Sequence, residues 1–359
     1  MGRTYLGELP ARTDVAIVGG TVSAYLLATV LAESGAQVVV LDPAQSVGAT
    51  GANQGVGHGY GGLAESAFRL VHAIGFDRAA ALYRMSDEGL AFLAERGVLS
   101  RCTGRWRASD AKEEQTLQTS AAHLRKMGQN ASFSDGVLSL PGEALVDPVR
   151  ALNALAACAA DAGARILTQQ QLLSLDDGVL RTPEAELCAD VVIHAADAAS
   201  SDWHPFFAPC LLTIRENAAV YSSLPMSGVE RYQMGYFTVR ETPLGTLVRG
   251  ARWATMHMET GETEPVIVPK IQAKLDAFAE QRGASSTDAD HRWAWIETTT
   301  CDNLPLVGPL PGAPTLFACS GFAGCDWGLG AGAALALAES LLRTGQPATP
   351  GLEPSRMVL

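Results

Sequence analysis

The segment from residue 14 to residue 42 most constrains the fold. It contains an apolar run, DVAIVG, a glycine turn, a helix-forming stretch, VSAYLLATVLAES, and a second apolar run, QVVVLD. The spacing of apolar residues changes from strand to helix and back, which is typical of a βαβ unit. Because both strands are almost wholly apolar, we expect a parallel sheet covered on both faces. Asp42 ends the second strand, where a carboxylate either accepts hydrogen bonds from ribose hydroxyls or caps a turn.

Length and charge limit the class of protein. A chain of 359 residues exceeds the usual size of one hydrophobic core, so we expect two subdomains. The net charge of −12 argues against a nucleic-acid partner, which requires clustered Lys and Arg. The seven cysteines include no CxxC pair, so we expect reduced thiols and no metal site.

Neither end of the chain predicts a membrane segment. The first residues, MGRTYLGELPARTD, lack the apolar core of a signal peptide, and the apolar stretch 329–342 is too short to span a bilayer. We therefore expect a cytoplasmic protein without a membrane span.

Downstream of the βαβ unit, residues 48–62 form a glycine-rich loop, of a kind that passes close to a ligand. Residues 98–145 are mixed and polar, with short strands. A second alternation of helix and strand begins at Asp147, with Pro148 placed for a helix start. The remaining expected elements are helices in 63–97, 269–282 and 329–342, strands at 189–197, 291–300 and 315–320, and an antiparallel sheet in 218–257.

Four motifs in this order carry a family resemblance. They are the phosphate loop with Asp42, then GATGANQG, which looks like GASxRNxG, then VDPVRALNALAACAADAGARI followed by DVVIHAAD, and finally TTTCDNLPLVGPLPGAPTLFACSGFAG, which is similar to TPDxLPxIGP…GHxG. Together they resemble the FAD-dependent oxidoreductases of the D-amino acid oxidase, glycine oxidase and sarcosine oxidase superfamily. The likeness covers nearly the whole chain.

The resemblance implies an α/β fold with a Rossmann-like FAD-binding domain and a substrate domain built on an antiparallel sheet. We expect the FAD-binding domain to comprise residues 1–75, 146–205 and 300–359, and the substrate domain to comprise residues 76–145 and 206–299. The implied activity is oxidation of a C–N bond in a small amine or amino acid by hydride transfer to noncovalently bound FAD. No catalytic residue is assigned. The expected cofactor-binding residues are Gly19, Gly20, Thr21, Asp42, Thr50, Gly51, Asn53, Gly55, Asp197, Gly321, Phe322, Gly324, Asp326 and Trp327.

Three of these residues depart from the family pattern. Thr21 occupies the second glycine position of the phosphate loop, where it either donates its hydroxyl to phosphate or blocks the approach. Asp197 replaces a glycine beside FAD. If its carboxylate faces the pyrophosphate at about 4 Å, repulsion costs roughly 4 kcal/mol, whereas a solvent-facing Asp197 costs little. Asp326 lies where GHG is common beside the flavin ring, and an anion there disfavours the charge of reduced flavin. Ala24, at the third glycine position, is a mild replacement.

The substrate residues are less well defined. Glu297 falls near the position of a family arginine that clamps a substrate carboxylate, which favours an amine substrate or the loss of catalysis. His58 is either a ligand-facing or a structural histidine. Tyr236, Arg249 and Arg252 face either the cavity of the substrate sheet or solvent. Trp293, Trp295 and Trp327 either line a pocket near the flavin ring or belong to an aromatic core, of which the core is favoured. Cys301, Cys319 and Cys325 are interpreted as buried reduced thiols.

Two other functions fit part of the sequence. A degenerate family member without flavin catalysis, acting as a partner subunit, scaffold or ligand-binding protein, would explain the changes at positions 21, 197 and 326. A nicotinamide-dependent dehydrogenase would explain the N-terminal unit but would leave the C-terminal signature unused.

Overall fold

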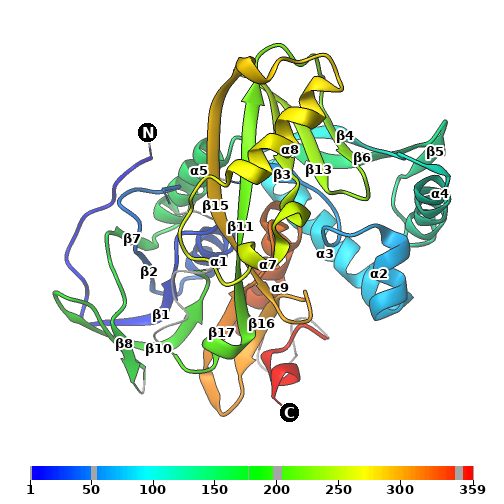
Figure 1. Ribbon diagram of the computed structural model, residues 1–359. Coiled ribbons are helices and arrows are strands. Elements are labelled where there is room, and N and C mark those ends of the chain that lie inside the picture. Colours follow the sequence, from blue (N-terminus) through cyan, green and yellow to red (C-terminus); the bar gives the residue numbers. More distant parts are fainter. Residues whose placement is uncertain (1, 50–54, 177, 197–203, 344–350, 359) are drawn as a thin grey trace.

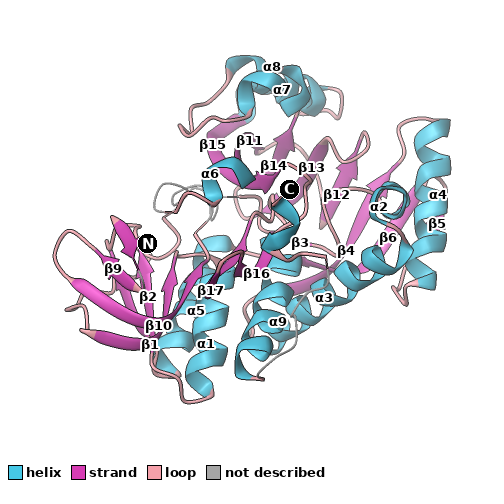
Figure 2. Ribbon diagram, turned by 90° about the horizontal axis from the view of Figure 1, so that it is seen from below, coloured by secondary structure: helices cyan, strands magenta, loops and turns pink. Residues whose placement is uncertain are grey.

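The computed structural model describes residues 2–49, 55–176, 178–196, 204–343 and 351–358. Two sheets lie next to each other, and helices cover both (Figures 1 and 2). The helices are α1 (Val22–Glu33), α2 (Ala67–Ile74), α3 (Phe76–Glu95), α4 (Ala111–Lys126), α5 (Pro148–Asp161), α6 (Phe207–Cys210), α7 (Met256–Glu259), α8 (Pro269–Glu280) and α9 (Ala331–Leu342).

The first sheet has the strand order β16-β17-β10-β1-β2-β7. Neighbouring strands from β17 to β7 are parallel, whereas β16 runs antiparallel to β17 and a β8–β9 hairpin extends from β10. The strands are β1 (Arg12–Val18), β2 (Val38–Asp42), β7 (Arg165–Thr168), β8 (Ser174–Asp176), β9 (Val179–Arg181), β10 (Glu186–His194), β16 (Leu306–Leu310) and β17 (Ala313–Ser320). The expected parallel βαβ core is confirmed, with antiparallel additions at one edge and beside β10.

Alternation along β1 explains why this sheet is buried on both faces. Val15 and Ile17 belong to a core shared with α1, α5 and α9, whereas Ala16 and Val18 belong to a separate core on the opposite face. Successive side chains of a strand point to opposite faces, so the wholly apolar half of β1, Val15–Val18, requires cover on both sides. Figure 2 shows α1, α5 and α9 together on one face of this sheet.

The second sheet is mostly antiparallel, with the order β15-β11-β14-β13-β12-β4-β6-β3, and β5 pairs with β6. Only the β12–β4 pair is parallel among its described strand pairs. Its strands are β3 (His58–Gly59), β4 (Ser100–Arg107), β5 (Ser132–Ser134), β6 (Val137–Leu145), β11 (Leu211–Tyr221), β12 (Val229–Tyr232), β13 (Phe237–Thr242), β14 (Gly245–Gly250) and β15 (Ala289–Thr300). The fold class expected from the sequence is therefore confirmed. The predicted domain limits remain a proposal.

The two faces of the second sheet have different neighbours. Helix α8 packs Leu275 and Phe278 against Phe237 and Val248 on one face. The opposite face carries Trp295 in a small apolar cluster beside the glycine-rich segment. The polar side chains of the candidate site lie on this second face.

Local structure differs from the sequence prediction at two helices. The helical segment 63–97 is divided into α2 and α3 at Gly75, whose φ of 85° lies in the left-handed region that favours glycine. Helix α4 was not predicted, because its surface is largely polar and its apolar positions are few. Its start is nevertheless specified locally, since the Asp110 carboxylate accepts a hydrogen bond from the Glu113 N–H at 2.8 Å. Among the described residues, no helix has the length and apolar character needed to cross a bilayer.

Candidate active site

The turn after β1 lies where a dinucleotide would be expected to bind. Strand β1 lies between β10 and β2 in the sheet, so the strand order changes direction at β1. In open α/β sheets, ligands bind at such a point, next to the carboxyl ends of the strands. Gly19 has a φ of 133°, a conformation that side chains rarely adopt, and α1 begins just after it. The N-terminus of α1 thus directs N–H groups toward the crevice.

Thr21 closes part of that crevice with its side chain. Its hydroxyl donates a hydrogen bond to the Ala195 carbonyl at 2.7 Å and accepts one from the Ala24 N–H at 3.2 Å. The first bond joins the start of α1 to the segment that follows β10, and the second caps α1. Thr21 is only 6% exposed. The hydroxyl is therefore used within the protein rather than directed at an open phosphate site.

Asp42 is equally engaged within the protein. It ends β2, is fully buried, and accepts hydrogen bonds from the Tyr25 hydroxyl at 2.7 Å and from the Ala44 N–H at 2.9 Å. Burial raises the pKa of Asp42, although both hydrogen bonds act to lower it. The carboxylate is at the strand end predicted for a ribose ligand, and Tyr25 holds it there.

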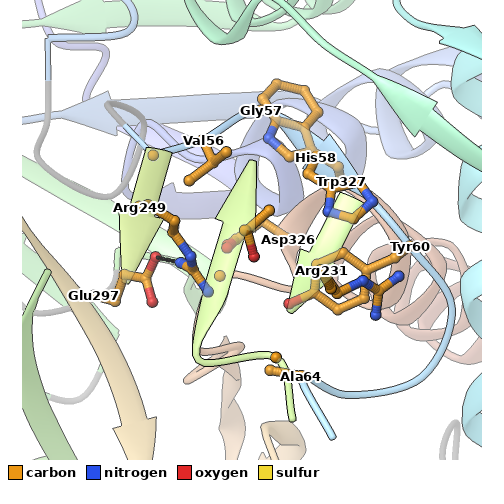
Figure 3. Close-up of a pocket in the computed structure, with 14 residues that line it drawn as sticks. Val56, Gly57, His58, Tyr60, Ala64, Arg231, Arg249, Glu297, Asp326 and Trp327 are labelled. Atoms are coloured by element: carbon orange, nitrogen blue, oxygen red, sulfur yellow. Dashed lines mark hydrogen bonds and ion pairs between the residues drawn. The ribbon is translucent and has the colours of Figure 1, made fainter. Parts of the chain in front are cut away.

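A separate cavity of about 40 Å³ lies on the open face of the second sheet. The glycine-rich segment, β12, β13, β14, β15 and the loop after β17 all contribute to it (Figure 3). Its lining residues are Gly55, Val56, Gly57, His58, Tyr60, Ala64, Arg231, Gly235, Thr238, Arg249, Glu297, Gly324, Asp326 and Trp327. The topology therefore brings two sequence-distant glycine segments against the substrate sheet.

Arg249 and Glu297 form the charged centre of this cavity. Arg249 Nη1 lies 3.2 Å from Glu297 Oε1, and the Trp295 indole N–H donates to the same oxygen at 2.9 Å. Burial acts to lower the pKa of Arg249, but the carboxylates of Glu297 and Glu216 raise it overall. Arg249 is consequently a permanent cation that pairs with Glu297 and is stabilised by the charge of Glu216, and Figure 3 shows the Arg249–Glu297 contact at the cavity.

A second charged group forms another wall. His58 Nε2 is 2.7 Å from Glu143 Oε2, and Arg231 forms an ion pair with the other oxygen of Glu143. Burial lowers the pKa of His58 well below 6.5, and Arg231 lowers it further. His58 is therefore neutral near pH 7 and donates a hydrogen bond to the Glu143 carboxylate. The Tyr60 ring is tilted by 48° against the His58 ring, with their centroids 4.9 Å apart, and the Arg231 guanidinium lies over the Tyr60 ring at 5.0 Å.

Some of the residues predicted to bind cofactor or substrate line the cavity, and others do not. Gly55, Gly324, Asp326 and Trp327 line it, as do the predicted substrate residues His58 and Glu297. Gly321 adopts a φ of 85°, and Phe322 is buried in the first core. Thr50, Gly51, Asn53 and Asp197 lie outside the described residues.

Other predicted residues lie away from the cavity lining. Tyr236 is 46% exposed on the turn before β13, and Arg252 pairs with Glu216 at 3.2 Å. Cys319 and Cys325 are buried as expected, whereas Cys301 is exposed, so the interpretation of Cys301 as a buried thiol is wrong. Trp295 is core, but its N–H also orients Glu297.

Sequence reasoning missed Arg231 and Glu143. Both are polar residues on strands, and strand alternation predicts which face a residue occupies but not whether that face lines a cavity. Their ion pair joins β6 to β12, which are not adjacent in the sheet. The spacing of residues along the sequence therefore does not predict it.

The comparisons with known proteins agree with this geometry. Residues 14–340 match the family model described as FAD dependent oxidoreductase. The chain belongs to this family. FAD is the cofactor of the family, whose members are oxidoreductases. None of the curated proteins matches the chain significantly.

Solved structures of several enzymes share the fold of this family member over almost its whole length. Glycine oxidase from Geobacillus kaustophilus is 19% identical with a TM-score of 0.76, and the match covers 97% of this chain and 99% of that one. L-proline dehydrogenase from P. horikoshii is 15% identical with a TM-score of 0.81, over 97% and 98% of the two chains. L-amino acid deaminase from Proteus vulgaris is 16% identical with a TM-score of 0.72, over 99% of both. At these identities the likeness establishes the fold.

The residue types present fit FAD at both ends of its expected path. A carboxylate ends β2, a glycine turn precedes the N-terminus of α1, and glycines from two loops border the cavity. The carboxylate can accept hydrogen bonds from ribose hydroxyls, and the N-terminus of α1 can donate to phosphate. The loop glycines allow the backbone to come close to a planar ring. Two of the polar groups, Asp42 and the Ala24 N–H, are held by side chains of the protein itself.

Proposed function

We propose that the protein oxidises the C–N bond of a small amino acid or amine with FAD as cofactor. The observation that carries this proposal is the Arg249–Glu297 pair, which faces a cavity between the glycine-rich segment and the loop after β17. Structural neighbours named glycine oxidase, L-proline dehydrogenase and L-amino acid deaminase support amino acids as the substrate class.

We assign the cofactor contacts by position. The turn at Gly19 and Gly20 with the N-terminus of α1 would hold the pyrophosphate, and Asp42 would hold the adenosine ribose. Gly55, Gly324 and Trp327 would border the flavin ring. When bound, FAD supplies an acceptor for the hydride that leaves the carbon next to the nitrogen.

The charges of the cavity recognise a zwitterion. The Arg249 guanidinium offers N–H groups to a substrate carboxylate, and its ion pair with Glu297 holds it in place. The carboxylates of Glu297 and Asp326 attract an ammonium or amine group, and both residues line the cavity. A small amino acid matches both halves of this arrangement, whereas a simple amine uses only the acidic half. No side chain is assigned as a general base.

The test uses protein loaded with FAD and freed of excess cofactor. Under anaerobic conditions, glycine, sarcosine, proline, both enantiomers of alanine and simple alkylamines are each added, and loss of the visible absorption of oxidised flavin is recorded. We expect rapid bleaching by at least one amino acid and slower bleaching after Glu297→Gln. Glu186→Gln is the matched control, because that carboxylate is an exposed partner of Arg181 in the first sheet. A flavin-loaded protein that no compound of the panel bleaches would contradict the proposal.

The second candidate function is that of a family member without flavin catalysis, acting as a partner subunit, scaffold or ligand-binding protein. The engagement of Thr21 and Asp42 by the protein's own groups favours it. Retention of FAD through desalting, followed by substrate bleaching, argues for the enzyme. A protein that stays colourless after incubation with FAD argues for the second candidate. A partner subunit and the cytoplasmic location stay predictions.

A further inference from the structure

The hydrogen bond between Tyr25 and Asp42 occupies a carboxylate that the fold places for a ribose. Both residues are fully buried, and the Tyr25 hydroxyl donates to Asp42 Oδ2 at 2.7 Å. Tyr25 belongs to the first turns of α1, immediately after the third position of the phosphate loop. The tyrosine therefore reaches from the phosphate-binding helix to the end of β2, across the path that a ribose would take.

The N-terminal segment encloses the same region from outside. The Arg3 carbonyl accepts a hydrogen bond from the Val47 N–H at 2.9 Å, in the turn after β2. Tyr5 is bonded to Thr168 at the end of β7: the Thr168 N–H donates to the Tyr5 carbonyl at 2.8 Å, and the Tyr5 N–H donates to the Thr168 hydroxyl at 3.0 Å. Figure 1 shows this segment running past β2 and β7 before it enters β1. Asp42 has no solvent access in this arrangement.

Burial decides what this bond does energetically. A buried carboxylate without partners is costly, so the Tyr25 hydroxyl stabilises the closed arrangement by supplying a donor. Ribose hydroxyls supply the same kind of donor. Because Asp42 has no exposed surface, a ribose hydroxyl can approach Oδ2 only if the Tyr25 hydroxyl moves away, and the two donors therefore compete for this position.

We propose that Tyr25 is an internal competitor of the cofactor: its hydroxyl holds Asp42 in the closed arrangement, and FAD binds by displacing it with a ribose hydroxyl. This inference rests on the proposed function only in taking FAD as the ligand. It identifies Tyr25 as a residue that sets the affinity for FAD by opposing it, while Asp42 acts in favour of binding.

The test measures the Kd for FAD by quenching of flavin fluorescence in the wild type, Tyr25→Phe and Tyr25→Met. We expect both variants to bind FAD about tenfold more tightly or better, because the closed state loses a hydrogen bond to a charged group. The Kd for FMN, which has no adenosine ribose, stays the same. In Tyr25→Phe/Asp42→Asn the gain for FAD disappears.

Tyr221→Phe is the matched control. Its hydroxyl donates to the Asp276 carboxylate at 2.7 Å, the same bond in the second sheet, so its removal leaves the Kd for FAD unchanged. Tyr25→Met keeps the inference testable if the phenylalanine variant does not fold.

Two results would overturn the inference. A folded Tyr25 variant with an unchanged or raised Kd for FAD would show that the bond is only structural, and the proposed function would stand. Failure of the wild type and both variants to bind FAD at all would overturn the inference together with FAD as the ligand.

Discussion

The turn after β1 and the cavity on the second sheet both hold buried carboxylates, Asp42 in the first and Glu297 in the second. Asp42 has neutral partners, Tyr25 and the Ala44 N–H, and no exposed surface. Glu297 has a cationic partner, Arg249, and both residues line a cavity. The hydrogen bonds from neutral groups use the acceptor positions of Asp42 within the protein. The charged groups of the Arg249–Glu297 pair border a cavity and can still interact with a ligand. The comparison teaches that one end of the expected FAD path is closed by the protein and the other remains open.

The largest expected effect comes from removing the cation of the open region. Arg249→Met leaves the buried Glu297 carboxylate without its cationic partner, so the free energy of unfolding should fall by about 3–5 kcal/mol. Urea denaturation followed by circular dichroism measures this loss. The double variant Arg249→Met/Glu297→Gln should recover part of it. A loss below about 1 kcal/mol, the value of an exposed ion pair, would show that the pair is not buried in solution.

His58, in the wall of the cavity, should make the free energy of unfolding depend on pH. Because the folded-state pKa of His58 lies well below 6.5, the unfolded chain binds more protons as the pH falls through 6.5. Stability contributed by neutral His58 is therefore present above pH 6.5 and decreases below it, by at most about 1.4 kcal/mol per pH unit. His58→Gln should flatten the curve of unfolding free energy against pH. His257→Gln, at an exposed position, should leave the slope unchanged, and equal slopes for both variants would contradict the assignment.

The closed region should show a smaller loss of stability. Thr21→Ala removes the cap of α1 and the bond to the Ala195 carbonyl, and we expect a cost of about 1 kcal/mol. Thermal unfolding of Thr21→Ser provides the control, because serine retains the hydroxyl. If serine and alanine cost the same, the Thr21 methyl group rather than its hydroxyl would be the contributing part.

The smallest expected effect concerns Cys325, which should not react with an alkylating reagent. Burial raises the pKa of the Cys325 thiol to about 12, next to the Tyr60 hydroxyl at 3.3 Å. Iodoacetamide at neutral pH should therefore modify the exposed Cys188 and Cys301 while Cys325 stays unmodified, as read by mass spectrometry. Modification of Cys325 at the rate of Cys301 would mean that the cavity is more open than the structure shows.

Local signals in the sequence predicted much of the first sheet and the ends of several helices. The apolar strands β1 and β2, the glycine turn between them and Asp42 at the strand end follow from spacing and composition alone. The start of α5 is also confirmed, since Asp147 accepts a hydrogen bond from the Arg150 N–H at 3.1 Å and Pro148 begins the helix. These features involve residues close in sequence, so their physics is visible without the fold.

The tertiary structure alone decided how the polar groups are used. Glu297 was predicted as a substrate residue, but its pairing with Arg249 depends on β14 and β15 both lying next to β11. Arg231 and Glu143 were missed because the sheet brings together strands far apart in the chain. The sequence alone predicted that Asp42 ends a strand, and this position made it a candidate ribose ligand. Whether that carboxylate faces a ligand or the Tyr25 hydroxyl depends on the packing of α1 against β2, because a buried group binds whatever donor the surrounding fold puts within reach.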